Sequence, residues 1–146
     1  MTVVDASVVI KWFVEEPDSA AARDVLASDD PLLAPAHLYV EVGRGLLRRK
    51  RAGDLSASDA KLALAGLPAI VQLVPLDALV QPAFDIADAC HVTIYDALYV
   101  ALAEARGDML VTADRRLCSG LTSTNWAGRA EHLRDSPASR REQPGA

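Results

Sequence analysis

Cysteine is scarce in this chain: its 146 residues include only Cys90 and Cys118. Neither cysteine belongs to a CxxC pair or lies in a cluster rich in histidine. Disulfide-dependent secreted domains and structural zinc sites need more cysteines at closer spacing. We therefore expect neither a disulfide framework nor structural zinc, and we expect a protein of a reducing compartment, the cytoplasm.

Long apolar runs are lacking as well. No stretch approaches the roughly 20 apolar residues that a helix needs to cross a bilayer. The first 16 residues contain Asp5 and Lys11, where a signal peptide would have a basic start and then an unbroken apolar segment. The sequence therefore predicts no signal peptide, no membrane-spanning helix and no membrane partner.

Positive charge is also in deficit. Lysine and arginine total 15 against 20 aspartates and glutamates, so the formal net charge is −5. This composition excludes a protein that coats nucleic acid through a broad basic surface. A phosphate can still approach acids that are gathered around cations, because bound metal changes the sign of the local field. The positions of the acids therefore decide whether nucleic acid is a reasonable partner.

The chain is 51% hydrophobic and has the length of one ordinary domain. Its apolar spacing predicts strands over 2–5, 32–34, 70–74 and 109–112, and helices over 8–14, 17–28, 36–51, 56–66, 78–89, 93–106 and 114–118. Strands that alternate with helices predict an α/β fold of three layers, with a central parallel sheet of four to five strands flanked by helices. We expect this domain to cover residues 1–133 and the polar residues 134–146 to form a disordered tail.

Three aspartates are predicted to lie near strand ends. Asp5 ends the first strand, Asp114 comes two residues after the strand 109–112, and Asp96 is in the first turn of its helix. Ligands of parallel α/β sheets bind beyond the carboxyl ends of the strands, so these carboxylates are expected to converge there. Such a cluster needs protons or cations to offset its repulsion. Oxygen ligands suit Mg²⁺ or Mn²⁺. These ions can activate a water molecule to attack a phosphodiester, so that no protein nucleophile is needed.

Glu41 is a fourth candidate acid. It is expected mid-helix, between Val40 and Val42, and leans toward the apolar side of its helix, where a charged residue needs a partner. The structural alternative is a salt bridge to Arg44 or Arg48, which follow it on nearly the same face.

Each aspartate has a purely structural interpretation too. Asp5 or Ser7 would cap the helix that follows, and Asp114 would cap the helix after it. The spacing from Thr93 to Asp96 is typical of a capping box. The spacing leaves these alternatives open for every single residue.

Taken in order, four motifs resemble those of PIN-domain proteins: Val3-Val4-Asp5-Ala6-Ser7, Glu41-Val42, Tyr95-Asp96-Ala97-Leu98-Tyr99 and Leu110-Val111-Thr112-Ala113-Asp114. The resemblance runs from about Thr2 to Leu121. Within that superfamily, the size of the chain is similar to that of the VapC toxins of bacterial toxin–antitoxin pairs.

This resemblance implies a role for each acid. Asp5 and Asp96 would be the central metal ligands, Glu41 and Asp114 would complete the acidic site, and Ser7 would hydrogen-bond a carboxylate or a metal-bound water. The implied activity is that of an endoribonuclease dependent on Mg²⁺ or Mn²⁺. The implied partners are RNA, a VapB-like antitoxin and, as a homodimer, a second copy of the chain.

The segment 44–51 is the densest basic patch before the tail. Arg44 and Arg48 are candidates for contact with the RNA backbone, and the alternative is that cations simply favour a helix C-terminus. For the antitoxin, the apolar residues at 12–13 and 46–47 are candidate contacts, against the alternative that they pack in the core.

Three rival functions stay open at this point. One is a phosphotransfer domain with an N-terminal acidic pocket, although Ser7 stands where haloacid-dehalogenase-like phosphatases need a second Asp and no lysine follows 109–112 as in a receiver domain. Another is a non-catalytic PIN-like binding module. The third keeps the nuclease and makes DNA its substrate, because metal-assisted phosphodiester chemistry does not need the 2′-hydroxyl.

Overall fold

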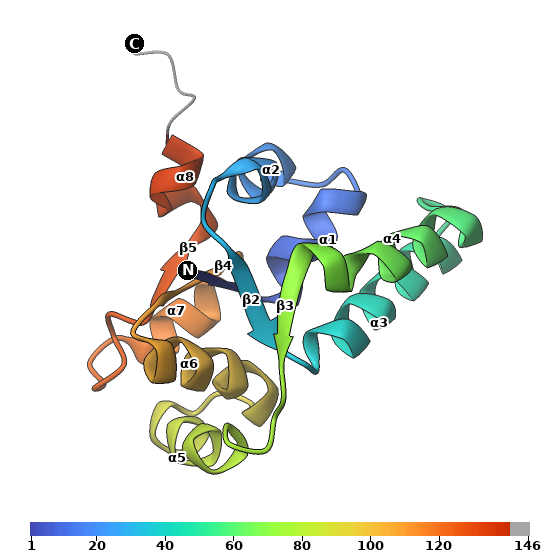
Figure 1. The fold of residues 1–146 in the computed structure, drawn as a ribbon. Helices are drawn as coiled ribbons and strands as arrows, with labels where there is room; N and C mark the ends of the chain where they lie inside the picture. The colour runs from blue at the N-terminus through green and yellow to red at the C-terminus, as the bar shows by residue number, and fades with distance from the viewer. Residues whose placement is uncertain (141–146) are drawn as a thin grey trace.

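The computed structural model describes residues 1–140; the last six residues of the expected tail lie outside the described part. Five parallel strands form one sheet in the order β3-β2-β1-β4-β5 (Figure 1). The strands are β1 (Thr2–Val4), β2 (Leu32–Pro35), β3 (Val71–Val74), β4 (Met109–Thr112) and β5 (Ala130–His132). The predicted α/β class and parallel sheet are confirmed.

Strand β1 lies at the centre of the sheet. Its Val3 pairs with Leu33 of β2 on one side and with Leu110 of β4 on the other, and all three side chains are fully buried. Helices cover both faces of a parallel sheet, so its strands are continuous apolar runs rather than alternating ones. This is why the short runs at 2–5 and 109–112 could be recognised as strands.

The helices form two layers. They are α1 (Ala6–Phe13), α2 (Ser19–Ala27), α3 (Leu38–Arg51), α4 (Ala57–Ile70), α5 (Val80–Cys90), α6 (Ile94–Arg106), α7 (Arg115–Leu121), the short α8 (Pro137–Arg140) and a 3₁₀ turn η1 (Leu133–Asp135). Right-handed crossovers place α1 to α4 on one face of the sheet and α5 to α7 on the other. Helix α6 packs against β1, β2 and β4, and α3 and α4 extend from the sheet as a pair (Figure 1).

The expected end of the fourth helix at Gly66 is wrong. Helix α4 continues through Gly66 and Pro68 to Ile70, and β3 begins at Val71. Leu67 in this last turn is fully buried. Burial of that side chain outweighs the weak helix propensity of glycine and the hydrogen bond that proline cannot donate.

The C-terminal elements were not predicted. Strand β5 has only three residues and pairs with β4 alone, so it is too short to show a hydrophobic period. Residues 134–140, expected to be part of a disordered tail, instead form most of η1 and all of α8. Helix α8 packs against α2, and Arg134 donates a 2.7 Å hydrogen bond to Asp18. The domain boundary at residue 133 stays a prediction.

Two of the apolar residues considered for partner contact belong to the core. Trp12 and Leu46 are buried, and the Trp12 indole donates a 2.8 Å hydrogen bond to the Ala22 carbonyl. Leu47, in contrast, is exposed. Within residues 1–140 no single helix is long and apolar enough to cross a membrane; only α5 and α6 together, bent by 114°, pass that test.

Candidate active site

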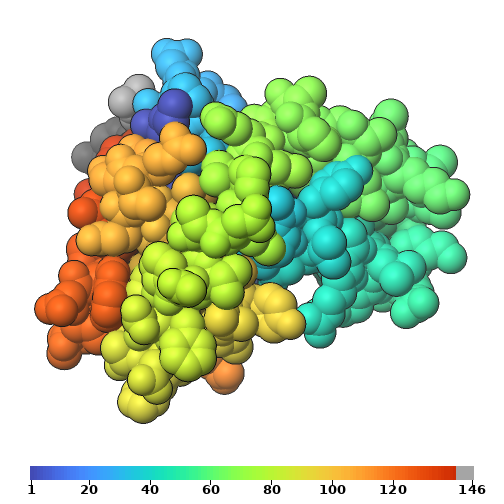
Figure 2. Space-filling view, turned by 60° about the horizontal axis from the view of Figure 1, so that its bottom comes forward, coloured from blue at the N-terminus to red at the C-terminus, as the bar shows by residue number. Residues whose placement is uncertain are grey.

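The four candidate acids come from four different segments at the carboxyl edge of the sheet. Asp5 follows β1 directly, and Asp114 lies two residues after β4. Asp96 is in the first turn of α6. Glu41 is in the first turn of α3, which begins at Leu38, so the expected mid-helix position is corrected. Figure 2 shows the surface hollowed between α3 (cyan) and the first turn of α6 (yellow).

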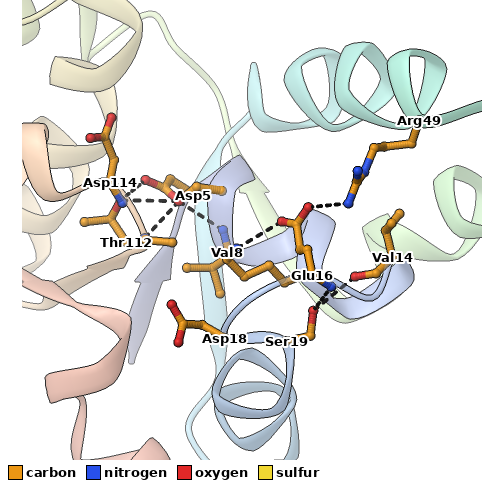
Figure 3. A network of polar contacts seen from close by, with 12 residues as sticks. Asp5, Val8, Val14, Glu16, Asp18, Ser19, Arg49, Thr112 and Asp114 are labelled. Atoms are coloured by element: carbon orange, nitrogen blue, oxygen red, sulfur yellow. Dashed lines mark hydrogen bonds and ion pairs between the residues drawn. The ribbon is translucent and has the colours of Figure 1, made fainter. Parts of the chain in front are cut away.

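Asp5 is the most buried of these acids, with 5% of its surface exposed. Its Oδ1 accepts hydrogen bonds from Ser7 Oγ at 2.5 Å and from the Val8 amide at 3.3 Å, and its Oδ2 accepts one from Thr112 (Figure 3). Burial raises the pKa of Asp5 to about 6, because desolvation and repulsion from Asp96 outweigh the three hydrogen bonds. A cation would offset both of these effects.

Two hydroxyl groups join Asp5, just after β1, to the end of β4 and the residues that follow it. Ser7 Oγ, which donates to Asp5, accepts a 2.9 Å hydrogen bond from the Ala113 amide. Thr112 Oγ1, which also donates to Asp5, accepts a 3.0 Å hydrogen bond from the Asp114 amide. Each hydroxyl therefore uses its donor and an acceptor site, which fixes the Asp5 carboxylate relative to Asp114.

The capping interpretation holds in geometric terms for two of the three aspartates, Asp5 and Asp114. Asp5 caps α1, and Asp114 Oδ1 accepts from the Arg116 and Leu117 amides at the start of α7. At α6 the cap is Thr93, whose hydroxyl accepts a 3.1 Å hydrogen bond from the Asp96 amide. Capping and metal binding do not compete, because a carboxylate offers about four lone-pair positions.

Glu41 is held by partners other than the expected arginines. Its Oε1 accepts a 2.6 Å hydrogen bond from the buried Tyr99 hydroxyl and lies 3.1 Å from His37 Nε2. Burial raises the pKa of Glu41. The hydrogen bonds from His37 and Tyr99 and the positive charges of His37 and Arg44 together lower it by more, so the net shift of the pKa is downward. The alternative, a salt bridge from Glu41 to Arg44 or Arg48, is absent among residues 1–140.

Electrostatic coupling runs through the whole set of acids. Burial raises the pKa of Asp96, and repulsion from Asp114 and Glu41 adds to that rise against a hydrogen bond from Thr93. Asp96 in turn raises the pKa of Asp5. Repulsion between carboxylates thus disfavours the charged forms of Asp5 and Asp96, as the sequence predicts for a cluster that requires cations.

The donor set fits a hard divalent cation. Across residues 1–140 no three Asp, Glu, His or Cys side chains lie close enough together to hold a metal ion by themselves. Mg²⁺ does not need one, since it keeps several waters and binds through one or two carboxylates plus substrate phosphates. Asp5 and Asp96, which are desolvated and coupled, are the side chains that gain most from such an ion.

The two arginines expected to contact RNA lie at different places. Both are exposed on α3. Arg48 lines a cleft that also contains Ser7 and Asp114, whereas Arg44 is outside that lining. Their neighbour Arg49 is bound to Glu16 at 2.7 Å, so its charge is committed within the protein.

Three residues of the site were missed as functional candidates: Thr112, Tyr99 and His37. The signals were weak. Thr112 is a fully buried hydroxyl at the end of an apolar strand, and Tyr99 is a buried phenol in an apolar helix, where each needs a polar partner. The position of His37, one helical turn before Glu41, offered no comparable signal.

Comparison with known proteins gives a consistent result. The family model described as the PIN domain matches residues 2–119. The chain is 35% identical over 127 residues to Ribonuclease VapC3 of Mycobacterium tuberculosis, covering 86% of this chain and 91% of that protein.

Two solved structures share the fold at lower identity. PAE2754 from Pyrobaculum aerophilum has a TM-score of 0.68 at 23% identity, covering 90% of this chain and 83% of that one. Mycobacterium tuberculosis VapC20, described as a sarcin-ricin loop cleaving toxin, also has a TM-score of 0.68 at 17% identity, covering 82% and 94%.

Proposed function

Since the chain belongs to the PIN-domain family, we propose that it is a toxin of the VapC type, an endoribonuclease that hydrolyses RNA phosphodiester bonds. The observation that carries this proposal is the placement of Asp5, Glu41, Asp96 and Asp114 at the carboxyl edge of the sheet, with Asp96 close enough to the other three to interact with each of them. A phosphotransfer function loses its basis with this family assignment.

Mg²⁺ or Mn²⁺ is the proposed cofactor, with Asp5 and Asp96 as principal ligands and Glu41 and Asp114 in support. A bound divalent cation would polarise the phosphodiester and lower the pKa of an attacking water. The donor set supports this choice, because all four side chains offer carboxylate oxygens.

The chain's own residues then serve to orient and restrain these carboxylates. Ser7 and Thr112 hold Asp5 in one rotamer through both of its oxygens. Tyr99 holds Glu41 from the opposite layer. Exact placement of reacting groups is worth orders of magnitude in rate, so these neutral donors are as much part of the site as the acids.

The partners follow from the same proposal. RNA is the substrate, a VapB-like antitoxin restrains the enzyme, and the protein acts as a homodimer in the cytoplasm. An arginine from the antitoxin would pair with the partly exposed carboxylates of Glu41, Asp96 or Asp114, since the guanidinium fork binds carboxylate through two parallel hydrogen bonds. The two cysteines, both free, are compatible with a reducing compartment.

The test is cleavage of a panel of structured RNAs by the purified protein in Mg²⁺, in Mn²⁺ and in EDTA. The matched variants are Asp5→Asn and Asp96→Asn, with the exposed Asp88→Asn on α5 as control. We expect metal-dependent cleavage in the wild type and the control, and a loss of at least about 100-fold in both site variants. Cleavage that survives in the site variants contradicts the proposal.

The same panel addresses the other two functions. Protein that binds metal and yet leaves every RNA intact supports a non-catalytic binding module. A parallel set of single-stranded DNAs, cut at an equal or higher rate than RNA, would make DNA the substrate.

A further inference from the structure

A cleft of about 710 Å³ adjoins the candidate active site. It lies between α1, α3, the start of α7 and the residues at and after the end of β5, and Ser7 and Asp114 are part of its lining. Its volume is that of a site for a small molecule or for a few linked units of a polymer. Anything held in this cleft is therefore close to Asp114 and to Ser7, which donates a hydrogen bond to Asp5.

The charge of this cleft is opposite to that of the chain. Six cationic side chains line it against three carboxylates, although the whole chain has a net charge of −5. The cations are Lys11, Arg48, Arg49, Arg115, Arg116 and Arg134, and the carboxylates are those of Glu16, Asp18 and Asp114. The cleft is thus a local basic surface on an acidic protein.

Two of the carboxylates are already paired with three of the cations. Glu16 lies 3.0 Å from Lys11 Nζ and 2.7 Å from Arg49 Nη2, at the end of the network opposite to Asp114 (Figure 3). Asp18 accepts a 2.7 Å hydrogen bond from Arg134, which lowers the pKa of Asp18. Lys11, Arg49 and Arg134 are therefore already engaged in ion pairs within the protein.

Three arginines are left over. Arg48, Arg115 and Arg116 are exposed, and within residues 1–140 none of them forms an ion pair. Arg48 comes from α3, whereas the other two begin α7 immediately after Asp114. The free positive charges therefore come from two different elements that line one cleft.

We propose, on the basis of the nuclease function above, that this cleft binds the ribose-phosphate backbone of single-stranded RNA next to the cut bond. Arg48, Arg115 and Arg116 contact its phosphates, for which the guanidinium fork is the matching donor. The volume admits a few nucleotides of one strand and not a duplex, whose phosphates are spread over two strands. Such contacts position the strand and supply affinity without reading sequence.

The experiment measures binding separately from cleavage. A fluorescently labelled 12-nucleotide RNA without secondary structure is titrated with full-length Asp96→Asn protein in Mg²⁺, where cutting is blocked, over a range of salt concentrations. Arg48→Gln, Arg115→Gln and Arg116→Gln are added singly and together. The control is Arg106→Gln, an exposed arginine at the end of α6 without an ion pair among residues 1–140.

We expect each cleft variant to weaken binding by about threefold to tenfold and the triple variant by more. Each lost phosphate contact should lower the slope of log K against log salt by about 0.7. An unchanged slope in the triple variant, or an equal loss in Arg106→Gln, overturns the proposal. Competition by duplex RNA as strong as by the single strand overturns its single-strand part.

Failure of the two proposals can be told apart. If the wild-type protein cuts RNA and the cleft variants bind RNA normally, the proposed role of the cleft is refuted and the nuclease function stands. If the wild-type protein cuts no RNA but the cleft variants lose RNA binding, the nuclease function is refuted and the cleft stands as an RNA-binding site.

Discussion

The hydroxyl of Tyr99 donates a 2.6 Å hydrogen bond to Glu41 Oε1, joining α6 to α3 across 58 residues of sequence. The tyrosine is 1% exposed, so this bond forms with little competition from water. It fixes one acid of the site relative to the helix that carries another, Asp96.

Removing that hydroxyl tests its importance. Tyr99→Phe keeps the ring in the core and leaves Glu41 with His37 as its remaining partner. We expect a loss of about 1 to 2 kcal/mol in the free energy of unfolding and a fall of roughly tenfold in kcat/KM, because the partly buried Glu41 carboxylate loses a donor. Urea unfolding and RNA cleavage measure the two effects. Tyr39→Phe, at an exposed tyrosine of α3, is the control, and an equal effect there would refute this role.

The hydroxyl of Thr112 offers a second test. Thr112→Val keeps the β-branched shape and removes both the bond to Asp5 and the acceptor for the Asp114 amide. We expect a destabilisation of about 1 to 3 kcal/mol and weaker Mn²⁺ binding by calorimetry, since two buried polar groups lose a partner. Thr2→Val on the same sheet is the control. Metal affinity equal to wild type would show that Asp5 does not depend on this hydroxyl.

The raised pKa of Asp5 predicts the pH dependence of stability. With a pKa of about 6 in the folded state against 3.8 unfolded, Asp5 keeps its proton longer in the folded protein. Its stabilising contribution is therefore fully present below pH 3.8 and is lost as the pH rises through 6. Its size is about 3 kcal/mol, from 1.36 kcal/mol per unit of pKa shift.

The measurement is urea unfolding in EDTA between pH 4 and pH 8. The wild type should lose stability relative to Asp5→Asn across this range, so that the variant is the more stable protein at pH 8. A difference between the two that does not change with pH would contradict the raised pKa.

Bound metal should offset the loss of stability that follows when Asp5 becomes charged. At Mn²⁺ or Mg²⁺ concentrations of about 100 times the dissociation constant, the folded state gains roughly 2.7 kcal/mol. We expect the Tm of the wild type and of Asp88→Asn to rise with metal and to return with EDTA. Asp5→Asn and Asp96→Asn should show little or no shift, and a full shift in either variant would remove that side chain from the ligand set.

The sequence was most informative where a local pattern has one physical cause. The buried strands are uninterrupted apolar runs, and the alternation of strands and helices implies a parallel sheet. That topology places residues after β1 and β4 at one edge, so Asp5 and Asp114 could be grouped without coordinates. The end of α4 was not predictable in this way, because burial of Leu67 overrides Gly66 and Pro68.

Other features of the site depend on contacts between distant segments. Local spacing suggested an arginine for Glu41, but its partners are a tyrosine 58 residues away and a histidine one helical turn before it. The sequence could not show that Arg49 forms an ion pair whereas Arg115 and Arg116 form none among residues 1–140. Ion pairing depends on which carboxylate the fold brings within 4 Å.

The sequence by itself therefore determined the fold class, the edge of the sheet that carries the acids and the chemistry that four carboxylates can support. These follow from hydrophobic period and residue type, which are local properties of the chain. Only the tertiary structure decided which hydroxyls hold Asp5, which acids disfavour one another's charge and which arginines face the cleft without a partner. Hydrogen bonds and Coulomb interactions depend on distances of a few ångströms between segments that lie far apart in the sequence.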